Sequence, residues 1–148
     1  MFFGGLIAIL LILLSAVPDL RSNELVLGWV GSAWALCSFL QAQELERTRF
    51  FFDLFNRFNE RYNALNDDLD RIVKQEGPLN KPDRQKVVDY FNLCAEEFMF
   101  YSRGYIPEDV WRAWRNGMRY YQRTPRIVTA WREERGTDSH YGFDFEDI

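Results

Sequence analysis

The chain opens with two long apolar runs that are joined by a short polar loop. Residues 1–18 carry no charge and neither do residues 25–43, while three charged residues lie between them in the loop PDLRSNE. A charge at the centre of a bilayer costs roughly 3 kcal/mol or more, so such runs are typical of membrane-spanning helices. Each run is near the lower length limit for a span. We predict a transmembrane helical hairpin over residues 1–43.

Three other interpretations of this segment stay open. A cleaved signal peptide would begin with basic residues, whereas this chain begins Met-Phe-Phe. Because both runs are short, the segment is also compatible with one span and a second, buried helix, or with a buried hairpin in a soluble protein. In favour of the two-span hairpin, small residues lie four apart, Gly28 with Ser32 and Gly31 with Ala35, and such spacing lets helices approach closely in lipid.

Arginine sets the expected orientation of the hairpin. The loop between the runs has a single arginine, Arg21, whereas residues 42–61 contain four arginines. Positively charged residues are retained on the cytoplasmic side. We therefore expect both termini in the cytoplasm and the loop on the outside.

The second apolar run continues into a long helical pattern, because residues 41–75 contain neither proline nor glycine. A seven-residue apolar repeat, which we call the heptad seam, comprises Phe51, Phe55, Phe58, Tyr62, Leu65, Leu69 and Ile72. Spacing by four and three residues is typical of a helix that associates along one face. The seam is predicted to be either a surface for self-association or the core-facing stripe of an intramolecular bundle.

Local signals divide the following residues into three further helices. Asn80 is a predicted N-cap, and its helix is expected to end at Gly104. This helix is apolar on several sides, so we expect it to be the central one. Pro107 and Pro125 suit the first position of the next two helices, since proline is tolerated there.

The predicted fold is therefore all-α, with three segments. They are the transmembrane hairpin (1–43), a cytosolic helical domain (44–135) and an acidic aromatic tail (136–148). The tail is expected to be extended and to dock its aromatic residues Tyr141, Phe143 and Phe145 onto the bundle.

Composition excludes several kinds of function. The net charge of −4 argues against general DNA binding. Cys37 and Cys94 lie in different regions and are expected to be unpaired, and with a single histidine they give no metal framework. With no nucleophile cluster or glycine-rich phosphate loop, we expect no metal, no cofactor and no enzymatic activity.

Arginines form the sharpest local pattern. They are spaced by three or four residues, at Arg112, Arg115, Arg119, Arg123 and Arg126. Guanidinium groups bind phosphate bidentately, so this pattern predicts a surface for an anion or an anionic partner. The candidate anions are lipid head groups, a nucleotide, RNA or the acidic tail. The alternative is a solvated surface whose arginines pair with acids of the same chain, such as Glu96, Glu97 or those of the tail.

Two weaker patterns bear on catalysis. Arg135 and His140 have the R-x4-H spacing of HEPN-type ribonucleases, in which arginine steadies a phosphate and histidine assists attack by the 2′-hydroxyl. Glu96 and Glu97 are adjacent carboxylates, but neighbours on a helix diverge by about 100° and do not face one site. We therefore expect Glu96 and Glu97 to be partly exposed or paired with arginine, and His140 to be a surface residue of the tail.

Residues 87–114, VVDYFNLCAEEFMFYSRGYIPEDVWRAW, carry a resemblance to small bacterial membrane-anchored proteins with a helical domain of unknown function. The matching positions are Phe91, Glu96, Glu97, Gly104, Ile106, Trp111 and Trp114. The resemblance implies an all-helical cytosolic domain and transfers no catalytic residue. The layout is also similar to that of small membrane effectors of bacterial antiviral systems.

Together with this resemblance, the observations predict a non-enzymatic protein anchored in the bacterial inner membrane, which assembles with itself or with a partner membrane protein. The first alternative is a membrane effector of an antiviral or stress system, which senses an anionic nucleotide or RNA through its arginine surface. The second alternative is a membrane-tethered HEPN-like ribonuclease.

Overall fold

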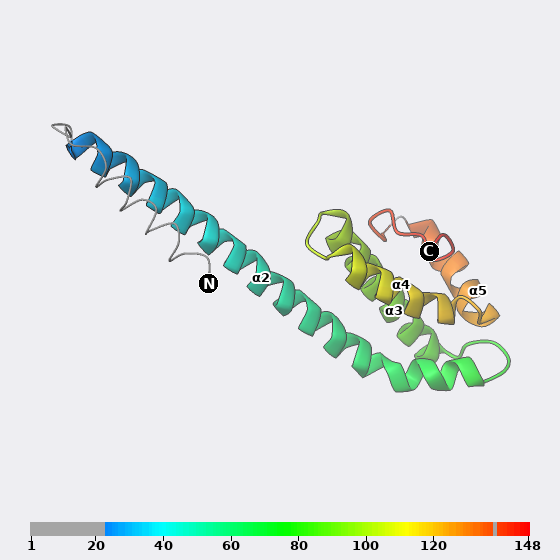
Figure 1. The fold of residues 1–148 in the computed structure, drawn as a ribbon. Helices are drawn as coiled ribbons and strands as arrows, with labels where there is room; N and C mark the ends of the chain where they lie inside the picture. The colour runs from blue at the N-terminus through cyan, green and yellow to red at the C-terminus, as the bar shows by residue number, and fades with distance from the viewer. Residues whose placement is uncertain (1–22, 138) are drawn as a thin grey trace. The chain divides into compact units, whose positions relative to one another are not determined.

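A computed structural model describes residues 23–137 and 139–148 (Figure 1). Within them every regular element is helical, so the all-α prediction is confirmed. The elements are α2 (Asn23–Lys74), α3 (Lys81–Ser102), α4 (Glu108–Tyr121), α5 (Pro125–Glu134) and the short 3-10 helix η1 (Arg135–Thr137). The chain divides between Leu45 and Glu46 into two compact units, which we describe separately.

In the first unit, the described part of the chain is the beginning of α2. All its side chains from residue 31 to residue 45 are exposed. Among the residues that the structure describes, none of the helices combines the length and the apolar character that a membrane span needs. The transmembrane hairpin is therefore not supported by the structure, and its first helix lies outside the described residues.

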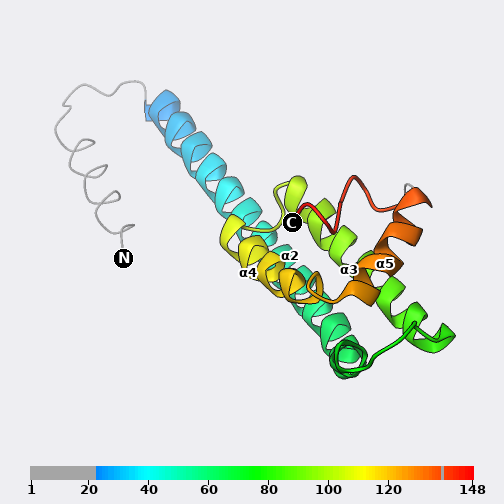
Figure 2. The same ribbon diagram turned by 90° about the vertical axis from the view of Figure 1, so that its right-hand side faces the viewer.

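The second unit has α3 as its central helix, as its apolar pattern predicts. α3 packs against both α4 and α5 (Figure 2). Phe91 of α3 is fully buried, and its ring lies 5.0 Å from that of Trp131 in α5. Cys94, one turn further along α3, is also fully buried and free, whereas Cys37 on α2 is free and exposed.

The heptad seam lies on the side of α2 that meets this core. Phe58, Leu65, Leu69 and Ile72 are buried in it. Phe51, Phe55 and Tyr62 are half-buried. The ring of Phe55 stacks on Trp114 of α4 at 5.9 Å. The structure thus uses the seam in the way that the core-facing alternative describes.

The helix boundaries follow from local chemistry. The side chain of Asn80 accepts the backbone N–H of Asp83 at 2.8 Å, which caps α3, and Gly104 after its end has a φ of +76°. Such a backbone angle favours glycine because it has no Cβ. Pro125 is the first residue of α5, as predicted. Pro107 lies one position earlier than predicted, since it is the N-cap of α4 and its carbonyl accepts the N–H of Trp111 at 3.0 Å.

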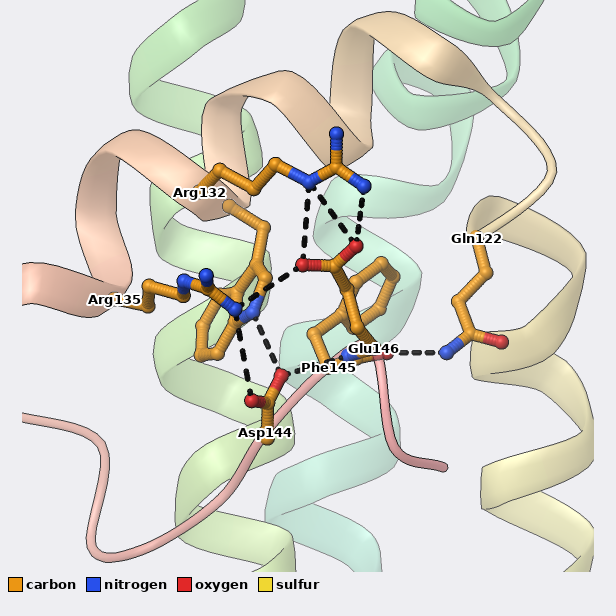
Figure 3. A network of polar contacts seen from close by, with 7 residues as sticks. Gln122, Arg132, Arg135, Asp144, Phe145 and Glu146 are labelled. Atoms are coloured by element: carbon orange, nitrogen blue, oxygen red, sulfur yellow. Dashed lines mark hydrogen bonds and ion pairs between the residues drawn. The ribbon is translucent and has the colours of Figure 1, made fainter.

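The C-terminal tail folds back onto the helices of the second unit (Figure 3). Phe143 and Phe145 are buried, as predicted, and the ring of Phe145 lies 5.2 Å from that of Phe91. The backbone carbonyl of Phe145 accepts a hydrogen bond from the side chain of Gln122. Tyr141 does not dock and remains 59% exposed, because its φ of +54° places it in a turn rather than in an extended segment.

Candidate functional site

One side of α4 carries arginines, while the other side contributes to the core. Trp111, Met118 and Tyr121 are buried, which fixes the rotation of the helix. Three of the predicted anion-binding residues lie on α4, and Arg123 follows just after its end. We call this set the α4 arginine surface: Arg112, Arg115, Arg119 and Arg123. Arg112, Arg119 and Arg123 are exposed, and Arg115 is half-buried.

The α4 arginine surface has no carboxylate partners among the described residues. Arg119 donates a hydrogen bond to the side chain of Asn116 at 3.1 Å. Arg115 holds its buried Nε without a partner within the part of the chain that the structure describes. By contrast, Arg71 forms an ion pair of 2.7 Å with Asp83, and Arg132 forms one of 2.7 Å with Glu146. Acidic residues of this unit thus pair with arginines outside the α4 arginine surface. Within the described residues, the four positive charges of this surface are therefore not offset by ion pairs.

Arg126 does not belong to this surface. α4 ends at Tyr121, and the short turn that follows redirects the chain before α5 begins. The guanidinium of Arg126 donates to the backbone carbonyls of Ile72 at 3.3 Å, Gln75 at 2.8 Å and Pro78 at 3.2 Å. Ile72 lies in the last turn of α2, where carbonyls lack a partner within the helix, and Gln75 and Pro78 lie in the loop that follows. The role of Arg126 is thus to hold the loop between α2 and α3.

The acidic tail pairs with α5 and η1 rather than with α4. Arg132 binds Glu146 through two nitrogens, with the shortest contact at 2.7 Å. Arg135 lies 3.3 Å from Glu146 and 3.9 Å from Asp144 (Figure 3). The Arg132 guanidinium holds the pKa of Glu146 below its usual range. These carboxylates are therefore committed to a structural network.

Arg135 and His140 do not share an exposed site. His140 is buried rather than on the surface, and its ring lies 4.8 Å from that of Trp131 in an edge-to-face arrangement. Arg135 is directed to the acids of the tail. The R-x4-H spacing is thus explained by packing of the tail.

Glu96 and Glu97 diverge, as expected for neighbours on a helix. Glu96 accepts two hydrogen bonds from Arg61 of α2, one of them 3.0 Å long. Glu97 is 94% buried. Burial raises its pKa to about 8, the positive charge of Arg61 opposes this rise, and the negative charge of Glu96 adds to it. Glu97 is therefore neither exposed nor paired with an arginine, contrary to expectation.

Glu97 lines a cavity of about 220 Å³ between α2, α3 and α4 of the second unit. The walls comprise Asn59 and Tyr62 from α2, Tyr90, Leu93 and Glu97 from α3, and Ala113, Trp114, Gly117 and Met118 from α4. A glutamate on a largely apolar helix, together with small residues one turn apart at positions 113 and 117, is the only sequence signal for this site. Which helices meet there cannot be read from any single segment.

Comparisons of the chain with protein families, with curated proteins and with solved structures found no match. A functional assignment therefore depends on the chemistry of the surfaces described above.

Proposed function

We propose that the chain is a bacterial membrane-anchored protein that acts by assembly, with itself or with a partner membrane protein, and not by catalysis. The observation that carries this proposal is the apolar surface at the beginning of α2. There Trp29, Trp34, Leu36, Phe39, Leu40 and Leu45 are all more than half exposed, with values from 51% to 77%. Several large apolar side chains exposed along one helix are typical of a segment that contacts a membrane or a protein.

Physical chemistry supports a partner for this surface. Full burial of a large apolar side chain is worth about 1.5–3 kcal/mol, so leaving several of them in water is unfavourable. A bilayer would cover them without competing polar contacts. In this proposal residues 1–43 form the anchor, and the helical unit that follows lies in the cytoplasm.

Membrane anchoring is tested by fractionating cells that express the full chain. We expect the protein in the membrane pellet after washing at alkaline pH and after high salt, with release by detergent only. Recovery in the aqueous supernatant after either wash would contradict an inserted anchor.

Assembly is tested at the small residues of α2. A Cβ placed at Gly28 or Gly31 would meet no atom within 4 Å, so the chain itself has room for a larger side chain there. If helices approach along this face in lipid, Gly31→Ile should reduce the oligomeric mass in detergent, measured by light scattering. Ala33→Ile, which lies on another side of α2, is the matched control. A monomeric wild-type protein would contradict self-assembly and leave assembly with a partner protein.

A second candidate function is the sensing of an anionic nucleotide or RNA, and the unpaired α4 arginine surface favours it. The double variant Arg112→Gln/Arg119→Gln should weaken the binding of a labelled RNA oligonucleotide. The slope of log K against log salt concentration should become less steep by about one for each phosphate contact that is lost. The variant Arg57→Gln/Arg103→Gln changes the net charge equally and is the control. Equal loss in both variants would indicate a nonspecific charge effect.

A further inference from the structure

The cavity between α2, α3 and α4 is lined by one carboxyl group, that of Glu97. Its volume of about 220 Å³ is far above the roughly 10–15 Å³ that a single water molecule needs, so a small organic molecule has room there. The side chain of Glu97 lines it, is 6% exposed, and makes no hydrogen bond to any residue that the structure describes. A carboxyl group that lines a cavity and has no protein partner is available to a ligand that enters the cavity.

The remaining walls select the chemical class of that ligand. Tyr62, Tyr90 and Trp114 contribute aromatic rings to the walls, and such rings pack against apolar groups. Asn59 adds an amide oxygen. The hydroxyl of Tyr62 lies 3.1 Å from that of Tyr121, and its oxygen keeps an acceptor lone pair whichever of the two donates. A carboxylate and acceptor oxygens suit a group that only donates hydrogen bonds and carries a positive charge, and the aromatic rings suit an alkyl part. A primary ammonium has these properties, with three donors and no acceptor.

We propose that this cavity binds a small primary ammonium ion, with Glu97 as its counter-ion and the rings of Tyr62, Tyr90 and Trp114 around its alkyl part. The site is separate from the α4 arginine surface and from the apolar surface of α2. It therefore does not depend on the proposed function.

The charged groups around Glu97 allow this role. From α2, Arg61 is nearest, but its guanidinium is bound to Glu96 of α3, so the charges of these two residues largely offset each other. The other titratable groups nearby are the phenols of Tyr62, Tyr90 and Tyr121 and the thiol of Cys94. Burial raises the pKa values of Tyr90, Tyr121 and Cys94 above their usual ranges, so these three groups are neutral around pH 7. From α4 the lining residues are Ala113, Trp114, Gly117 and Met118, none of them charged.

Protonation makes the expected binding dependent on pH. Because the pKa of Glu97 is about 8, the carboxyl group is mostly protonated at pH 7 and must release a proton when a cation binds. Affinity for an alkylammonium, whose own pKa is near 10, should therefore rise roughly tenfold between pH 7 and pH 9.

Gly117 provides a way to close the cavity. A Cβ at this position would meet no atom within 4 Å, so a larger side chain can extend into the empty space without a clash. Gly117→Leu also favours the helix, because glycine is a poor helix former. This variant removes the space and leaves Glu97 in place, whereas Glu97→Gln removes the charge and leaves the space.

The experiment uses the full-length protein in detergent, with n-butylammonium as the probe and 1-butanol as its uncharged equivalent. We expect calorimetry to show binding of n-butylammonium that strengthens roughly tenfold from pH 7 to pH 9. At pH 7 it should also show the release of nearly one proton, measured in buffers of different ionisation enthalpy. Binding should be lost in both Glu97→Gln and Gly117→Leu and retained in Glu96→Gln.

Three results would overturn the proposal. They are no binding to the wild-type protein at any pH, equal binding of 1-butanol, or unchanged binding in both cavity variants. Circular dichroism of each variant shows whether it is folded. If one variant does not fold, the other is decisive, because the two act on different parts of the same site. A pH titration of the Glu97 carboxyl carbon by NMR in the wild-type protein is an independent test, since n-butylammonium should lower the apparent pKa of Glu97.

Discussion

The indole nitrogen of Trp131 donates a hydrogen bond of 3.0 Å to Oδ1 of Asp144, and the same oxygen accepts the backbone N–H of Glu146 at 2.9 Å. One carboxylate oxygen thus connects the core of the helical unit to the C-terminal tail. It fixes the tail on both sides of Phe145, which is fully buried.

Replacing Asp144 should loosen the tail. Asp144→Ala leaves the indole N–H of the buried Trp131 without its acceptor, and such a loss costs about 1–3 kcal/mol. We expect a decrease of this size in the free energy of unfolding, measured with denaturant. Asp147→Ala, at an exposed position of the same tail, should change it little. Equal effects of the two substitutions would argue against the network in Figure 3.

Asp83 joins the end of α2 to the beginning of α3, because Arg71 donates to its Oδ1 at 2.7 Å. The Arg71 guanidinium holds the pKa of the Asp83 carboxyl below its usual range. Stability from this pair is present above the unfolded-state pKa and is lost as pH falls through the lower folded-state pKa. Asp83→Asn should cost about 2 kcal/mol at pH 7 and much less under acidic conditions. Asp68→Asn, which removes the exposed partner of Arg71, should have a smaller effect. An Asp83→Asn penalty that is independent of pH would show that the charge is not responsible.

Glu97 should have the opposite pH dependence. Its folded-state pKa of about 8 lies above the usual value of 4.5, so the native state binds more protons than the unfolded state between these values. Stability therefore falls as pH rises through this window, by at most about 5 kcal/mol for a shift of this size. Glu97→Gln is expected to gain stability over the wild-type protein as pH increases from 5 to 9, as measured by thermal unfolding. A constant difference across this range would mean that the folded-state pKa is not raised.

Arg126 should stabilise the loop between α2 and α3 through its planar guanidinium. Lysine has a single nitrogen and cannot reach the carbonyls of Ile72, Gln75 and Pro78 in the same geometry. We expect Arg126→Lys to cost about 1–2 kcal/mol and to increase amide hydrogen exchange around residues 72–80. Arg123→Lys, on the exposed α4 arginine surface, is the control. Unchanged exchange in this loop would contradict the assigned role.

The sequence predicted helix boundaries well because their signals are local. Asn80 and Gly104 act through their own side chain and backbone, so neighbouring residues are enough to place them. Residues whose role depends on tertiary contacts were not predictable in this way. Arg126 fits the arginine spacing, but the turn after Tyr121 separates it from the others. The sequence favoured partial exposure or an arginine partner for Glu97, whereas its burial depends on how α2, α3 and α4 meet.

The complete burial of Cys94 has a practical consequence. Of the two cysteines in the chain, only Cys37 is exposed, and burial also raises the pKa of the Cys94 thiol, which suppresses its reactive thiolate form. A maleimide dye should therefore label the native sequence at one known position on α2, with no cysteine having to be added or removed. The emission colour of that dye would then report directly whether this part of the helix is surrounded by water, lipid or protein.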